Sequence, residues 1–240
     1  MICLLTIFCI IIFNITFRGS AIRVVDDCDP NAYARTEVAL SNSPIPVYSL
    51  PGDNDYPKCT NPTAGWMNYQ QYMMNINTKY WDIPQEYDVK RQVSRMENFS
   101  FLYRRVLFLG LNTVSNIEDE WETAFRVQDN IDWVRETVEA YWDNADAIFV
   151  MGYGRLVADE SEPFYDAMVS LTKKPGWADR LLVYARRSSE LDIDRSVGGN
   201  KNFIELKVGS EWSILDVRVR TKMDGTPKLN FEVVGDSENV

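Results

Sequence analysis

The sequence predicts an α/β fold, a layered sandwich of mixed β-sheets flanked by helices. The first observation is that three continuous apolar runs, residues 106–111, 147–151 and 181–184, are separated by segments of helical periodicity. Short apolar runs of this kind are typical of strands buried on both faces of a sheet. The second observation is that the C-terminal region alternates between apolar and polar residues, as half-exposed antiparallel strands do. Buried strands that alternate with helices and precede an antiparallel region indicate layers of sheet and helix.

The composition limits both the domain organisation and the chemistry. The chain has 240 residues, a net charge of −10 and no histidine, with 45% hydrophobic and 25% charged residues. These proportions indicate one globular domain. The acidic balance argues against a nucleic-acid partner, because phosphates would be repelled. The absence of histidine excludes Ser-His-Asp and Cys-His nucleophile pairs and histidine-ligated zinc. Any catalysis would rest on carboxylates, lysine, tyrosine, asparagine or thiols.

The N-terminal segment has the composition of a targeting sequence. Residues 1–17 are uncharged and largely apolar, and Arg18 ends the run. The run is short for a membrane-spanning helix, which needs about 20 residues, and residues 19–21 offer the small side chains of a cleavage site. We therefore predict that residues 1–20 are a signal peptide or an apolar anchor and that residues 21–240 form one domain.

An alternative interpretation of this segment is a strand of the core, because residues 10–17 are rich in isoleucine, phenylalanine and threonine. The two interpretations predict different locations. A signal or anchor predicts a secreted protein or one on a membrane of the secretory pathway, with membrane contact only through this segment. A core strand predicts a cytoplasmic protein.

The remaining cysteines and one sequon fit the secretory interpretation. Cys28 and Cys59 are the two cysteines outside the apolar segment. An even pair in a secreted chain predicts a disulfide, and the alternative is two unpaired thiols. Asn98 begins an Asn-Phe-Ser sequon, which predicts a glycosylated asparagine if the chain enters the secretory pathway.

The first half of the domain contains one expected strand and one expected helix. Residues 45–50 predict a short strand, and residues 51–55 supply the turn-forming residues that end it. Residues 75–97 have an irregular pattern, which predicts a long surface excursion. Residues 65–74 carry an apolar stripe at helical spacing, which favours core packing over a ligand site: Trp66, Tyr69 and Met73.

The second half alternates helices with the buried strands. Residues 120–144 have a helical period with a break near Asp129, and residues 164–171 form a second amphipathic pattern. Gly152, Tyr153 and Gly154 predict a turn after a strand. Three C-terminal segments have the alternation of antiparallel strands: residues 202–208, 214–221 and 228–234.

Residues 46–55 resemble the strand and turn of calcineurin-like metallophosphoesterases. The resemblance is greatest to a secreted or membrane-associated branch whose turn reads PGDN[DE] and is followed by a cysteine, here Cys59. Cys28, Asp29 and Tyr33 resemble an upstream Cys-acidic-Tyr element of that branch. The resemblance extends from about residue 28 to residue 234. Further matches are Glu97 with Asn98, residues 106–112, Ser115 with Asn116, Trp121, Arg126, Asn130, Trp133, residues 185–194, and Asn202 with Phe203.

The resemblance implies a site in which two divalent ions share a bridging carboxylate and activate water. This chain departs from the family at most ligand positions. It begins after the expected Asp-x-His strand, so the resemblance implies a fold that is incomplete at the N-terminus. Ser20 stands where the bridging aspartate is expected. Ala185 and Ser189 stand at the two histidine positions of the last motif, and Arg187 stands at its aspartate position.

Few candidate site residues remain under this resemblance. Asp53 keeps a metal-ligand position, and Asn54 occupies the catalytic position of the turn. The alternative for Asp53, Asn54 and Asp55 is a turn whose side chains cap their own backbone. Arg186 and Arg187 place positive charge near the expected metal site. They predict anion binding in the vacated cleft, and the alternative is a solvated loop.

The sequence therefore predicts a catalytically degenerate calcineurin-like phosphoesterase-domain protein, a pseudoenzyme that needs no cofactor and serves as a binding or structural module. The alternative is an active metal-dependent phosphoester hydrolase with atypical carboxylate ligands and two divalent ions. A third possibility is a truncated gene product, in which residues 1–17 are the relic of a family strand.

Overall fold

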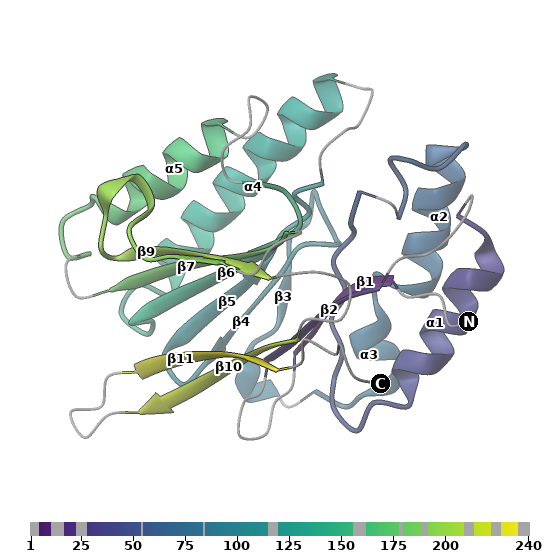
Figure 1. Cartoon of the computed structure of the whole chain (residues 1–240), viewed down its shortest axis with the longest axis horizontal. Helices are drawn as coiled ribbons and strands as arrows, with labels where there is room; N and C mark the ends of the chain where they lie inside the picture. The colour runs from purple at the N-terminus through teal and green to yellow at the C-terminus, as the bar shows by residue number, and fades with distance from the viewer. Residues whose placement is uncertain are drawn as a thin grey trace.

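A seven-stranded mixed sheet is the centre of the protein (Figure 1). The computed structural model describes residues 5–10, 17–22, 28–53, 55–83, 85–114, 120–155, 162–177, 180–188, 192–208, 214–221 and 227–234. The sheet order is β3-β4-β5-β6-β7-β9-β8. Its strands are β3 (Lys90–Arg91), β4 (Phe99–Tyr103), β5 (Val106–Gly110), β6 (Ala147–Gly152), β7 (Leu181–Arg187), β8 (Asp192–Asp194) and β9 (Phe203–Val208). The predicted α/β class is confirmed.

The middle of the sheet is parallel and its margins are antiparallel. β5, β6, β7 and β9 run in the same direction, whereas β4 pairs antiparallel with β5 and β8 pairs antiparallel with β9. Every residue of β5 and β6 is buried, as the apolar runs predict. Because β5, β6, β7 and β9 are parallel, their carboxyl ends meet at one edge of the sheet.

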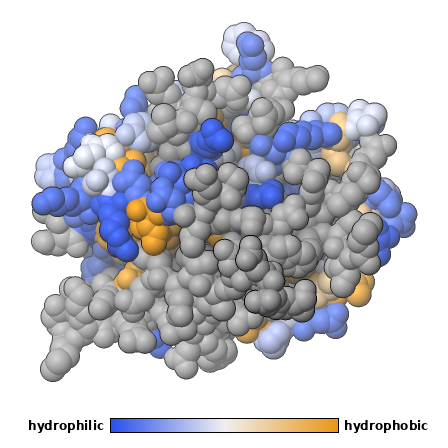
Figure 2. All heavy atoms as spheres, in the orientation of Figure 1, coloured by the Kyte–Doolittle hydropathy of each residue, from blue (hydrophilic) through white to orange (hydrophobic). Residues whose placement is uncertain are grey.

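Helices cover one face of this sheet and further strands lie against the other (Figure 1). β10 (Ile214–Thr221) and β11 (Pro227–Val234) form the antiparallel hairpin that the sequence predicts, and Leu229 packs on the apolar core of the main sheet. β1 (Leu5–Ile10) pairs antiparallel with β2 (Phe17–Ile22), and β2 lies beside β10. The described surface in Figure 2 is largely hydrophilic, with hydrophobic residues in small groups. Among the described helices, none is both long and apolar enough to cross a bilayer.

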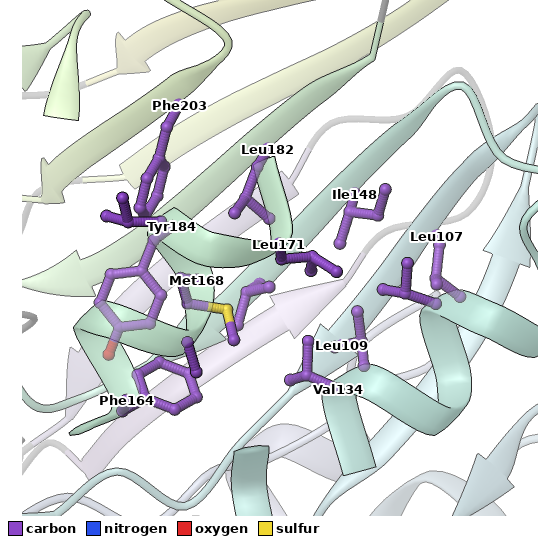
Figure 3. Close-up of a cluster of buried hydrophobic side chains, with 14 of the residues drawn as sticks. Leu107, Leu109, Val134, Ile148, Phe164, Met168, Leu171, Leu182, Tyr184 and Phe203 are labelled. Carbon is purple, nitrogen blue, oxygen red and sulfur yellow. The ribbon is translucent and has the colours of Figure 1, made fainter. Parts of the chain in front are cut away.

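The helix-covered face is held by an apolar core (Figure 3). It lies under α4 (Glu120–Ala140) and α5 (Glu162–Thr172). The predicted break near Asp129 is wrong, because α4 is continuous and the Asp129 carboxylate points out to accept from Arg95 Nε at 2.8 Å. The labelled core residues are Leu107, Leu109, Val134, Ile148, Phe164, Met168, Leu171, Leu182, Tyr184 and Phe203.

β9 differs from its sequence-based prediction. It lies parallel to β7 within the main sheet rather than in an antiparallel C-terminal group. Its alternation arises because Glu205 and Lys207 pair with Arg186 and Asp192 rather than pack under a helix. Alternation reports which side chains are covered, and it does not report the direction of the neighbouring strand.

Three helices form a smaller layer beside the sheet: α1 (Pro30–Ser41), α2 (Pro62–Tyr72) and α3 (Ile76–Tyr80). α1 and α2 begin with an Asp29 or Asn61 cap followed by proline, a favourable helix start. Tyr69 and Met73 are buried between these helices and Trp66 is partly buried, so the predicted core role of the stripe is confirmed.

Residues 45–50 do not form the predicted strand. The segment passes between two cores, with Val47 in the helical layer and with Tyr48 and Leu50 in the core of the sheet. Ser49 Oγ donates to Met73 O at 2.9 Å. Successive side chains therefore enter different cores, which produces strand-like alternation without a pairing strand.

The predicted surface excursion over residues 75–97 is also wrong in part. It contains α3, a 3₁₀ turn (Gln85–Tyr87) and the edge strand β3. Asn77 and Glu97 are buried. The Arg91 guanidinium links these polar positions by donating to Asn77 Oδ1 at 2.5 Å and to Glu97 O at 3.3 Å.

Candidate functional site

A polar cluster lies at the carboxyl edge of the parallel strands, where α/β proteins commonly bind ligands. Arg187 ends β7, and Tyr153 follows β6. Asp53 and Asp55 come from the turn that precedes α2. We call Asp53, Asp55, Tyr153 and Arg187 the edge cluster.

The turn at residues 52–55 is built around Asp55. Asp55 is 1% exposed and Asp53 is 6% exposed. Asp55 N donates to Gly52 O at 3.0 Å, and Gly52 N donates to Asp55 Oδ2 at 2.6 Å. This is the self-capping turn that the sequence offered as the alternative to a metal site. Asn54 lies outside the described residues.

The Asp55 carboxyl group is held in an unfavourable environment for a charge. Burial is the main cause that raises its pKa to about 7, and nearby Asp53 contributes to the rise, whereas the Gly52 amide and the Arg187 guanidinium oppose it. Within the described part of the chain, Asp55 Oδ1 has no hydrogen-bond partner. The Tyr33 hydroxyl anchors the turn from α1 by donating to Asp55 O.

Arg187 of β7 contacts the loop that follows β6. Its Nη1 donates to the Tyr153 hydroxyl at 3.2 Å, and its guanidinium carbon is 5.8 Å from the centre of the Tyr153 ring. Burial raises the pKa of Tyr153, Asp53 and Asp55 add to that rise, and Arg187 opposes it. The edge cluster thus combines two carboxyl groups, one guanidinium and one phenol. It can donate to and accept from a polar ligand.

Arg186 does not belong to this cluster. Its Nε donates to Glu205 Oε1 at 2.6 Å, and the side chain is buried. Because successive residues of a strand point to opposite faces, Arg186 and Arg187 diverge. Anion binding by Arg186 stays a prediction, although Glu205 offsets the charge of its guanidinium. Arg187 interacts electrostatically with the Asp55 carboxyl group, which weakens but does not remove its attraction for an anion.

The loop that carries Tyr153 is held by Thr113, which Gly154 approaches closely. Thr113 Oγ1 accepts from Tyr153 N at 2.7 Å and from Gly154 N at 2.9 Å. A Cβ atom on Gly154 would collide with the Thr113 carbonyl, so glycine is required for this contact. The predicted turn after β6 is found at this position.

A network of buried side-chain amides lies next to the carboxyl edge of the sheet. Asn98 Nδ2 donates to Asn130 Oδ1 and to Gln92 Oε1, both at 2.7 Å, and Asn98 Oδ1 accepts from Asn112 N at 2.6 Å. Asn130 Nδ2 donates to Asn112 O at 2.8 Å. Asn112 Nδ2 also donates to Glu97 Oε1 at 2.9 Å. These contacts fix the loop that leaves β5. The sequence singled out Glu97, Asn98, Asn112 and Asn130 through the family resemblance, but it did not show that they contact one another.

The network also bears on the expected glycan. Asn98 is 0% exposed, and its Nδ2 is the atom to which a glycan would be attached. In this fold that atom is enclosed and makes two hydrogen bonds. A glycan at Asn98 stays a prediction, and this hydrogen-bond network would have to be absent where the glycan is attached.

Cys28 and Cys59 lie as the sequence predicts. Their sulfur atoms are within bonding distance, and their Cα atoms are 5.7 Å apart, which is the spacing of a disulfide. Asn68 Nδ2 of α2 donates to Cys28 O at 3.0 Å. The bridge connects the start of α1 to the segment that follows the edge-cluster turn.

The residues that the family resemblance aligns with metal ligands are dispersed or replaced. Among the described residues, no group of three or more histidine, cysteine, aspartate or glutamate side chains is placed to hold a metal ion. Asp53 lies in the edge cluster, and Ala185 is buried in the sheet. Ser189 and the Ser20 side chain lie outside what the structure describes.

Comparison of this chain with protein-family models, with curated proteins and with solved structures finds no match. The fold and the site define a mixed α/β protein with a seven-stranded sheet and a compact polar cluster at its carboxyl edge.

Proposed function

We propose that this chain is a calcineurin-like phosphoesterase-domain protein that has lost metal-dependent catalysis and serves as a binding or structural module in the secretory pathway. The family part of the proposal rests on the sequence resemblance. It is supported by the order of layers, with helices on one face of a mixed sheet and strand hairpins on the other. It is also supported by the position of the turn at residues 52–55 beside the carboxyl edge.

The observation that carries the loss of catalysis is the position of Arg187. A two-metal centre holds two dications about 3.5–4 Å apart, and several anionic ligands must offset their repulsion. Here the Arg187 guanidinium acts electrostatically on the Asp55 carboxyl group, which could serve as a ligand, and it opposes the rise in the pKa of Asp55. A fixed positive charge at that place repels a dication and competes for the same carboxylates.

A binding role follows from what the edge cluster retains. Arg187 and Tyr153 can donate hydrogen bonds, and Asp53 and Asp55 can accept them. All four belong to elements anchored by the disulfide, the amide network or the sheet. A polar ligand could be held at such a cluster by these hydrogen-bonding groups.

Two observations bear on the proposed secretory location. The geometry of Cys28 and Cys59 supports an oxidising compartment. The pairing of β1 with β2 supports the alternative in which residues 1–20 fold with the domain. N-terminal sequencing of protein recovered from the secretory pathway separates them. A start after residue 20 is expected for a signal peptide, and retention of β1 would contradict cleavage.

The test of lost catalysis combines metal content with turnover. Full-length protein would be incubated with Mn²⁺, Zn²⁺ or Fe²⁺, desalted and measured for bound metal and for hydrolysis of phosphomonoesters and phosphodiesters. We expect less than stoichiometric metal and no turnover, in the wild type and in Asp53→Ala alike. Two bound metals with turnover that disappears in Asp53→Ala, but not in the exposed control Asp132→Ala, would establish the active hydrolase instead.

A further inference from the structure

Four exposed apolar side chains lie at the N-terminal half of α4 and on the loop beside it. Trp121 is 77% exposed and Phe125 is 63% exposed. They are one helical turn apart, so they share a face of α4. On the loop, Val93 is 93% exposed and Met96 is 45% exposed. We call these four residues the apolar patch.

The loop is held against α4 by its polar residues. Arg95 Nη1 contacts Glu122 Oε1 at 2.6 Å, and Arg95 Nε contacts Asp129 Oδ2 at 2.8 Å. Gln92 Nε2 donates to Asp129 O at 2.9 Å. Phe125 follows Glu122 by three residues and precedes Asp129 by four, so it neighbours both anchors. The loop that carries Val93 and Met96 is therefore held beside the part of α4 that carries Trp121 and Phe125.

Towards its C-terminal end, the same face of α4 carries carboxylates. Asp132, Glu136 and Glu139 are exposed along the second half of the helix. Arg135 is exposed there and lies 4.0 Å from Asp132. The last turn of α4 contains no basic residue. Carboxylates near a helix C-terminus face the negative end of the helix dipole, so cations supplied from outside the helix are favoured at this end.

We propose that this face of α4 is a docking surface for a protein segment that carries apolar side chains at one end and lysine or arginine at the other. Its composition fits, because tryptophan, methionine and arginine are enriched at interface centres. Pairing of this face with a second copy of itself would bring like charges together. An anionic membrane would be repelled by the same carboxylates.

The test uses a short helical peptide of leucine and lysine, with a leucine and glutamate peptide of equal length for comparison. Binding of each fluorescent peptide to the full-length protein would be followed by anisotropy at low and physiological salt. We expect the lysine peptide to bind, and Trp121→Ala with Phe125→Ala to weaken its affinity by about tenfold or more. Asp132→Asn with Glu136→Gln should weaken it about threefold and reduce its salt dependence.

A matched control tests whether any pair of exposed apolar side chains can bind the lysine peptide. Val38→Ala with Met67→Ala removes exposed side chains of α1 and α2 and should leave the affinity unchanged. The proposal is overturned if the glutamate peptide binds equally well or if the patch variant binds the lysine peptide as tightly as the wild type. It is also overturned if the patch variant abolishes binding to phosphatidylcholine vesicles or a self-association of the wild type, since the occupant would then be a lipid surface or a second copy.

Discussion

The helix-covered face of the main sheet and its carboxyl edge are both buried, but by different chemistry. Under α4 and α5 an apolar core packs against the sheet, and the one buried guanidinium of α4, Arg126, is paired with Glu122. At the carboxyl edge Asp53, Asp55 and Asn98 are as fully enclosed as core leucines. Burial is costly for a polar atom that lacks a hydrogen-bond partner, as Asp55 Oδ1 does among the described residues. The difference teaches that this protein maintains polar groups at one edge at the expense of stability there, as expected for a site rather than a core.

The largest expected effect comes from a substitution in the apolar core under α4. Leu109→Ala removes a side chain that is 0% exposed beneath α4. We expect the free energy of unfolding in urea to fall by ~2–5 kcal/mol, because the substitution loses apolar burial and leaves a cavity. Val38→Ala, at an exposed position, is the control. A loss below ~1 kcal/mol for Leu109→Ala would show that the core is loosely packed.

The next effect concerns the covalent support of the edge. Replacing both Cys28 and Cys59 by serine opens a loop with a sequence separation of 31 residues. We expect a loss of ~3–4 kcal/mol in the free energy of unfolding under oxidising conditions, chiefly through the unfolded state. Mass spectrometry of non-reduced peptides tests the bridge itself. Two free thiols in protein from the secretory pathway would contradict it.

The third effect is the pH dependence of stability that Asp55, at the carboxyl edge, should cause. Asp55 has a folded pKa of about 7, above its ordinary value of 3.8. A carboxyl group with a raised folded pKa binds its proton more tightly in the folded state. The free energy of unfolding must therefore fall as pH rises from about 4 to about 7, by up to ~4 kcal/mol.

Asp55→Asn should remove most of that fall and make the protein more stable than the wild type at pH 8. Asparagine can still accept the hydrogen bond from Gly52 N. Asp132→Asn, at an exposed position on α4, is the matched control and should leave the pH profile unchanged. Equal pH profiles for the wild type and Asp55→Asn in urea unfolding would contradict the account of this carboxyl group.

The smallest effect lies at the opposite edge of the sheet. Arg104 and Arg105 form the turn between β4 and β5 with φ values of 46° and 62°, a conformation that favours asparagine and glycine. Arg104→Asn should raise the free energy of unfolding by ~0.5 kcal/mol, whereas Arg105 is retained because it pairs with Asp146. A lower stability of Arg104→Asn than of the wild type in differential scanning calorimetry would show that backbone strain does not determine the stability of this turn.

The buried strands and their helices could be predicted because burial on both faces imposes long apolar runs. β5, β6 and β7 follow that rule, as do α4 and α5. The absence of a strand at residues 45–50 and the direction of β9 could not be predicted. Alternation shows which side chains are covered, and it says nothing about the neighbouring strand. The first segment alternates between two cores. The second alternates because Glu205 and Lys207 form ion pairs, although it lies parallel to β7.

The candidate site was less predictable than the core. Asp53, Asp55 and Arg187 were singled out by their place in motifs, and the structure brings them together with Tyr153. The separation of Arg186 from Arg187 depends on which face of β7 each side chain occupies. The amide network around Asn98 depends on contacts between α4 and loops distant in sequence. A single sequence contains no periodic signal for such contacts.

The most direct test of the central claim is the metal affinity of Arg187 variants. Isothermal titration with Mn²⁺ and Zn²⁺ would compare the wild type with Arg187→Asp and with Arg187→Met, which removes the charge without adding a ligand. The account predicts no stoichiometric binding to the wild type, little to Arg187→Met and measurable binding to Arg187→Asp, where a third carboxylate joins Asp53 and Asp55. Binding of two metal ions by the wild type, weakened by Arg187→Asp, would contradict it.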